Sequence, residues 1–105
     1  MVPARKLWIA FAVGSAGTIY VDQGARRAIT ERGVSLLPTG VTGAKGAFAV
    51  ADAVEIADPD GRVFAKGLTR LDAAGLREVA GLQTADLPEG VNHEVIHRDD
   101  LVVLP

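Results

Sequence analysis

The chain of 105 residues contains no cysteine, and its aromatic residues are one tryptophan, one tyrosine and three phenylalanines. Without cysteine it has no disulfide bond, thiolate nucleophile or thiolate metal ligand, which is compatible with a reducing cytoplasm. The longest apolar run, Leu7 to Val13, is much shorter than the roughly 18 to 20 residues that cross a bilayer. We therefore expect a cytoplasmic protein without a membrane partner.

The composition is typical of one folded domain, with 49% hydrophobic and 23% charged residues. The net charge of −2 is unevenly distributed. Residues 1–51 carry six Lys or Arg against two Asp or Glu, whereas residues 52–105 carry five against eleven. A polyanion is therefore expected to meet the first half of the chain.

Turn and cap residues divide the chain into short elements. Asp22 and Asp72 are expected to cap two helices, of which the first ends at Gly33. The sequence Asp58-Pro59-Asp60-Gly61 is typical of a tight turn between two strands. The glycines at 40, 43 and 46 predict turns or bulges. The predicted helices are 23–32 and 72–79, and the extended segments are 17–21, 34–37, 53–57, 62–68 and 94–104. This order favours a mostly antiparallel barrel or sandwich, mainly β with two short helices (α+β).

The run LWIAFAV, Leu7 to Val13, alternates bulky and small residues, which predicts a buried strand rather than a signal peptide. All five aromatic residues lie within or beside apolar runs. We therefore expect Trp8, Phe11, Tyr20, Phe48 and Phe64 to lie in the core rather than on a stacking surface.

Two catalytic patterns overlap in VNHEVIHRDD, residues 91–100. His93, Glu94 and His97 spell the zinc-protease pattern H-E-x-x-H, which requires a helix to bring both imidazoles to one metal. The local preference is for a strand, where four residues separate the histidine backbones by about 13 Å. We therefore predict no metal ligands. His97, Arg98 and Asp99 spell the kinase tripeptide H-R-D, but no D-F-G follows. No catalytic residue is predicted in this chain.

Three stretches, read together, resemble a known family. They are YVDQGARRAITERGVSLLPTGV (residues 20–41), FAVADAVEIADPDGRVFAKGL (residues 48–68) and EVIHRDDLVVL (residues 94–104). Their ordered combination resembles the PUA domain (named after pseudouridine synthase and archaeosine transglycosylase) at the C-terminus of bacterial glutamate 5-kinases. ARKLWIAF, residues 4–11, is similar to the segment that joins the kinase domain to the PUA domain.

The resemblance implies a six-stranded pseudobarrel with two short helices. It implies that residues 1–105 are a single PUA domain, with residues 1–7 a linker from a missing N-terminal amino acid kinase domain. The parent would phosphorylate glutamate on its γ-carboxylate, the first step of proline biosynthesis. ATP and Mg would bind to the kinase domain, and this chain would bind no cofactor. The kinase domain would be the main partner, and a homo-oligomer could form through the parent.

PUA domains of RNA-modifying proteins bind RNA through the first helix, the loop after it and the last strand. The corresponding residues here are Gly24, Arg26, Arg27, Gly33, Ser35, Pro38, Gly40 and Arg98, and most of them lie in the basic half. The chain departs from the family at Ala51, where a glycine is usual, and at Thr69-Arg70, where Asn-Tyr is usual. Three hypotheses follow: an accessory domain that regulates the kinase or supports its oligomer, an RNA-binding module, or an independent enzyme.

Overall fold

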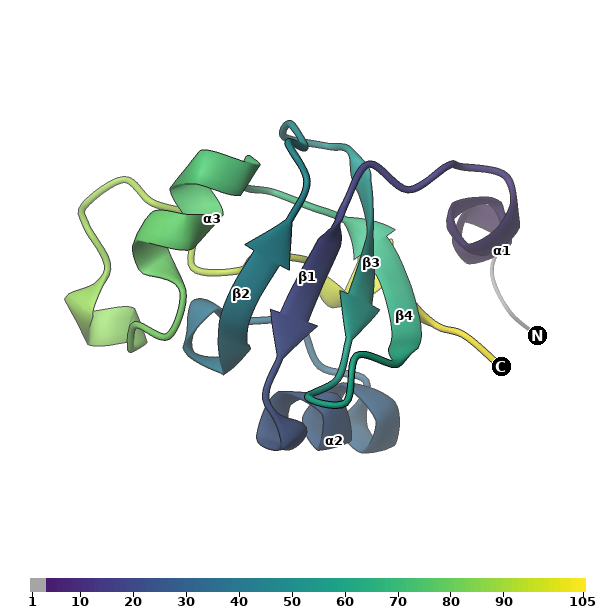
Figure 1. The fold of residues 1–105 in the computed structure, drawn as a ribbon, viewed down its shortest axis with the longest axis horizontal. Helices are drawn as coiled ribbons and strands as arrows, with labels where there is room; N and C mark the ends of the chain where they lie inside the picture. The colour runs from purple at the N-terminus through teal and green to yellow at the C-terminus, as the bar shows by residue number, and fades with distance from the viewer. Residues whose placement is uncertain (1–3) are drawn as a thin grey trace.

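The computed structural model describes residues 4–105, which form one five-stranded sheet and three α-helices. The strand order is β2-β1-β3-β4-β5. In Figure 1, α1 and α3 lie on opposite flanks of the sheet, and α2 lies across the end where β1 finishes. The α-helices are α1 (Ala4–Phe11), α2 (Gln23–Arg32) and α3 (Ala73–Val79), and the strands are β1 (Thr18–Val21), β2 (Val41–Lys45), β3 (Ala53–Ala57), β4 (Val63–Leu68) and β5 (Leu101–Val103).

The sheet is mostly antiparallel, as predicted, with one exception. β1 pairs in parallel with β3, whereas the other three pairs of strands are antiparallel. The mainly β, α+β class is therefore confirmed. The described residues form five strands rather than the six of the expected pseudobarrel, and Leu36 and Ile96 add an isolated antiparallel bridge outside the named strands.

The caps that the sequence predicted set the ends of α2 and α3. The Asp22 carboxylate accepts a hydrogen bond from the backbone N–H of Ala25, and Asp72 accepts one from Gly75 in the same way. Such caps satisfy backbone donors that the first helical turn leaves unpaired. Gly33 ends α2 with φ of 62°, in the left-handed region that favours glycine.

The core lies between the sheet and the elements that cover it. β3 contributes most, because Val54, Ile56 and Ala57 are fully buried. α2 contributes Ile29, and α3 contributes Leu76. The buried cluster consists of Ile19, Val21, Ile29, Leu36, Val41, Phe48, Val54, Ile56, Phe64, Ala65, Ala73, Leu76, Val95, Ile96 and Leu101.

The prediction of a buried strand at residues 7–13 is wrong. Residues 4–11 form α1, which packs beside β4 and β5, and only Ile9 of this helix is buried. Trp8 and Phe11 are exposed, so the prediction that they belong to the core is also wrong. Both edges of β1 are already paired, with β2 and β3, and β4 is already paired with β3 and β5. Of the predicted linker, residues 1–3 lie outside the described residues, and residues 4–7 begin α1.

Two further segments differ from the prediction. The glycine-spaced segment after Gly40 forms β2, which is paired with β1 and was not predicted as a strand. The predicted bulge is present within it, since Tyr20 pairs with Gly43 and Val21 with Val41, which leaves Thr42 as the extra residue. The last region is shorter than predicted, since Arg98–Asp100 form a 3-10 turn before β5. None of the helices in residues 4–105 has the length and apolar character needed to cross a membrane.

Candidate functional site

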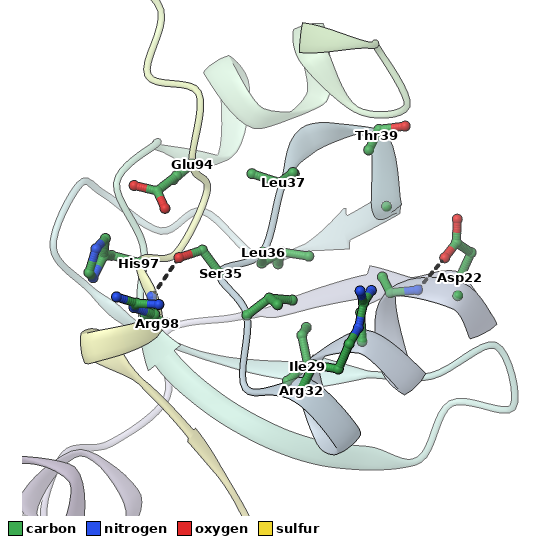
Figure 2. Close-up of a pocket in the computed structure, with 15 residues that line it drawn as sticks. Asp22, Ile29, Arg32, Ser35, Leu36, Leu37, Thr39, Glu94, His97 and Arg98 are labelled. Atoms are coloured by element: carbon green, nitrogen blue, oxygen red, sulfur yellow. Dashed lines mark hydrogen bonds between the residues drawn. The ribbon is translucent and has the colours of Figure 1, made fainter.

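An open groove of about 720 Å³ runs between α2, the segment that follows it and residues 94–98. In Figure 2, Ser35, His97 and Arg98 gather toward one end of the groove, and Asp22 and Thr39 lie toward the other. The lining residues are Asp22, Gly24, Ala25, Ala28, Ile29, Arg32, Val34, Ser35, Leu36, Leu37, Thr39, Gly40, Glu94, His97 and Arg98.

One wall of the groove is a stripe along α2. Its lining residues recur at the spacing of one helical face, at positions 24, 25, 28, 29 and 32. The chain after Pro38 then passes close to the start of this helix. A Cβ atom at Gly40 would lie 2.6 Å from the Cβ of Ala25, so this close approach requires glycine.

The other wall is tied to the first by hydrogen bonds between segments far apart in sequence. The Ser35 hydroxyl oxygen accepts a hydrogen bond of 2.8 Å from the backbone N–H of Arg98. The backbone N–H of Leu36 donates to the carbonyl of Ile96 at 2.9 Å, and the N–H of Val95 donates to the carbonyl of Leu36 at 2.8 Å. These bonds fix the separation of the two walls.

The charged and titratable side chains around the groove differ in whether they already contact another polar group. Asp22 caps α2, and Glu94 forms an ion pair with Arg70 at 3.6 Å. His97 accepts a hydrogen bond at Nδ1 from the backbone N–H of Asp99. Among residues 4–105, Arg32 and Arg98 have no carboxylate within ion-pair distance. The groove can therefore offer two guanidinium groups to an anion.

The structure brings together four of the eight predicted surface residues: Gly24, Ser35, Gly40 and Arg98 line the groove. Gly33, Arg26, Arg27 and Pro38 do not line it. Arg27 is exposed, Pro38 is buried and Gly33 ends α2.

Arg26 has a different set of contacts. Its Nε lies 3.3 Å from a carboxylate oxygen of Asp58, and its guanidinium lies over the ring of Phe64, 5.6 Å from the centroid. Asp58 is only 5% exposed. Arg26 is thus held against the turn that joins β3 to β4 rather than directed into the groove.

Sequence reasoning missed Arg32 and His97, although both line the groove. Helical spacing could have found Arg32, because it lies on the same face as Gly24 and Ala28, whereas Arg26 and Arg27 do not. The position of His97 depends on the bridge between Leu36 and Ile96, and no local sequence pattern predicts this bridge. Among residues 4–105, no three His, Cys, Asp or Glu side chains are arranged to hold a metal ion.

Comparison with known proteins gives consistent matches. The model of the PUA domain matches residues 17–91. Glutamate 5-kinase of Frankia casuarinae is 46% identical over 105 residues, a match that covers 96% of this chain and 28% of the enzyme. This chain therefore spans less than a third of the length of that relative. The resemblance derived from the sequence is confirmed.

The solved structures agree on the fold. The PUA domain from Aeropyrum pernix K1 superposes with a TM-score of 0.65 at 22% identity, covering 90% of this chain and 49% of that one. A chain of the archaeal box H/ACA sRNP Nop10-Cbf5 complex gives a TM-score of 0.57 at 17% identity, covering 80% and 26%. At these identities the likeness concerns the fold alone.

Proposed function

The chain belongs to the PUA domain family, and from this premise we propose that it is the non-catalytic accessory domain of a bacterial glutamate 5-kinase. The observation that supports this proposal is the extent of the sequence match. Nearly the whole chain, 96%, aligns with glutamate 5-kinase of Frankia casuarinae, yet the alignment accounts for only 28% of that enzyme. An amino acid kinase domain would occupy the remainder of the parent chain.

The proposed division of work assigns the chemistry to the other domain. The kinase domain binds ATP, Mg and glutamate and transfers the phosphoryl group to the γ-carboxylate, in the cytoplasm. Residues 1–105 are its single PUA domain, and they regulate the kinase or support its oligomer. The groove is compatible with this role. Hydrogen bonds hold its two walls together, and Arg32 and Arg98 in its lining could bind an anion.

Reading the gene upstream of Val2 tests the parent, since an open frame without an amino acid kinase domain would contradict the proposal. The full-length parent, with its kinase domain, should phosphorylate glutamate in the presence of ATP and Mg. A version that lacks residues 4–105 should retain phosphoryl transfer at saturating substrate but change its oligomeric state or its regulation, measured by light scattering and by inhibition assays. Loss of transfer by a folded kinase domain would contradict a non-catalytic role.

A second function, binding of structured RNA, is favoured by one observation: Arg32 and Arg98 line the groove beside Gly24, Ser35 and Gly40. One of the structural neighbours is a chain of a complex described as an sRNP. Phosphate contacts release counterions, so two such contacts would make log Kd rise with log salt with a slope of about 1.4 to 1.8.

Fluorescence anisotropy with labelled structured RNA at low salt tests whether the groove binds RNA. We expect Arg32→Ala and Arg98→Ala each to weaken RNA binding and to reduce the salt slope by about 1. Arg26→Ala is the matched control, because Arg26 is paired with Asp58 outside the groove. Equal loss of binding in all three variants, or no binding by the unmodified chain, would exclude the groove as an RNA site.

A further inference from the structure

The most apolar surface of α1 faces water. Leu7, Trp8 and Phe11 are 46%, 54% and 71% exposed, whereas Ile9 is fully buried. At 3.6 residues per turn, Leu7, Trp8 and Phe11 fall within a sector of about 100°, on the side of the helix away from Ile9. This sector is called the α1 apolar face below.

The α1 apolar face is held in a fixed orientation. Near the start of the helix, the Arg5 guanidinium lies 2.5 Å from a carboxylate oxygen of Asp100. Just beyond its end, the Lys66 ammonium group donates a hydrogen bond to the carbonyl of Val13. Ile9 anchors the middle, and Figure 1 shows α1 beside β4 at the margin of the molecule. The helix is therefore docked on the domain while its apolar side points outward.

The concentration of exposed apolar side chains on α1 is unusual within residues 4–105. Elsewhere in this part of the chain the exposed large hydrophobic residues are leucine or valine, namely Leu37, Val50, Val63 and Val103, whereas both exposed aromatic ones lie on α1. Clustered exposed apolar side chains mark interaction surfaces, and aromatic residues are enriched at the centres of such surfaces. A single exposed leucine would carry no such meaning.

We propose that the α1 apolar face is the docking surface for the kinase domain that precedes this domain in the same chain, an inference that rests on the proposed function. In the proposed parent the kinase domain precedes this one, since the match accounts for only 28% of the Frankia casuarinae enzyme, and α1 is the first described element of this domain. Covalent linkage gives the neighbouring domain a high effective concentration at the surface nearest to the connection. The α1 apolar face is that surface.

Hydroxyl-radical footprinting of the full-length parent, read by mass spectrometry at each side chain, tests the docking. Trp8 is the only tryptophan of residues 1–105 and reacts rapidly when exposed, so it serves as the reporter. Trp8 is 54% exposed in residues 4–105 alone. We expect its oxidation in the parent to be severalfold slower than that of a tryptophan with this exposure. Oxidation at the rate of an exposed tryptophan would overturn the inference.

The double variant Leu7→Gln and Phe11→Gln, made in the full-length parent, supplies the second reading. Glutamine keeps the helix propensity, and neither side chain belongs to the core. We expect Trp8 oxidation and protease cleavage near residues 1–3 to rise severalfold. Val50→Gln is the matched control, since Val50 is 60% exposed and lies on neither the groove nor α1, and it should change neither reading. A double variant that behaves like this control would overturn the docking.

Two further outcomes identify what covers the surface. Protection of Trp8 that disappears on dilution would assign the surface to a second copy of the chain and overturn docking within one chain. A different result would contradict the proposed function: a parent that does not phosphorylate glutamate or has no amino acid kinase domain. An active glutamate 5-kinase with an unprotected Trp8 would overturn this inference alone.

Discussion

The hydroxyl oxygen of Ser35 accepts a hydrogen bond of 2.8 Å from the backbone N–H of Arg98, across 63 positions of sequence. This contact joins the segment after α2 to the turn before β5, so it sets the width of the groove (Figure 2). It also places Arg98, whose side chain is exposed, at the position where the two walls converge.

Ser35→Ala removes the acceptor for this backbone donor. Because water can replace the lost partner, we expect the free energy of unfolding to fall by only about 1 kcal/mol, measured by urea denaturation. RNA affinity should fall as well, because the wall that carries Arg98 loses its tie. Ser35→Thr keeps the hydroxyl and is the control. Equal affinity of the alanine variant and the unmodified chain would contradict the positioning role.

Gly40→Ala places a methyl group 2.6 Å from the Cβ of Ala25, closer than two carbons can approach. We expect a loss of about 1–3 kcal/mol of stability, because α2 and the loop must move apart. Gly43→Ala is the matched control, since its methyl group meets no heavy atom within 4 Å. Its effect should stay below about 1 kcal/mol. Thermal or urea unfolding compares the two, and equal losses would contradict the packing argument.

Asp58→Ala should be one of the most destabilising changes of a polar residue in this chain. The buried carboxylate accepts hydrogen bonds from the backbone N–H groups of Asp60 and Arg62, at 2.9 and 3.0 Å, and pairs with Arg26. We expect a loss of about 3 kcal/mol in urea denaturation, because these donors and Arg26 lose their partner together. Arg26→Ala should cost about 1 kcal/mol, since the two backbone hydrogen bonds remain. The reverse order would contradict this description of the turn.

Asp22→Ala should lower stability while raising the affinity of the groove for RNA. The lost cap costs about 1 kcal/mol, and the lost carboxylate removes a negative charge from the groove lining. Asp72→Ala is the matched control, because Asp72 caps α3 through the same contact but lies outside the groove. It should lose similar stability without a gain in affinity. Urea denaturation and anisotropy on the same samples separate the two effects.

Much of the fold follows from local patterns. The bounds of α2 agree with the prediction because Asp22 and Gly33 mark both ends, and β3 agrees because AVEIA lies just before a tight turn. β2 could not be predicted in the same way. Val41 and Thr42 favour a strand, but Gly43, Ala44 and Lys45 do not, so pairing with β1 decides the conformation of the segment.

The error at residues 7–13 has a related cause. An apolar run of this length suits a buried strand or a helix, and only the position of its partners decides between them. Here the helix buries Ile9 and leaves Trp8 and Phe11 exposed, a choice that composition alone would not favour. The groove shows the same limit, since helical spacing could identify Arg32 but the pairing of Ser35 with Arg98 spans most of the chain.

The bridge between Leu36 and Ile96 has a consequence for the order in which the domain is made. During synthesis on the ribosome, the residues of α2 and of the segment after it emerge before residues 94–98 do. The second wall of the groove does not exist until residues 94–98 have emerged. The nascent chain therefore has no groove until its last segment is available, and ligand binding is among the last properties to mature.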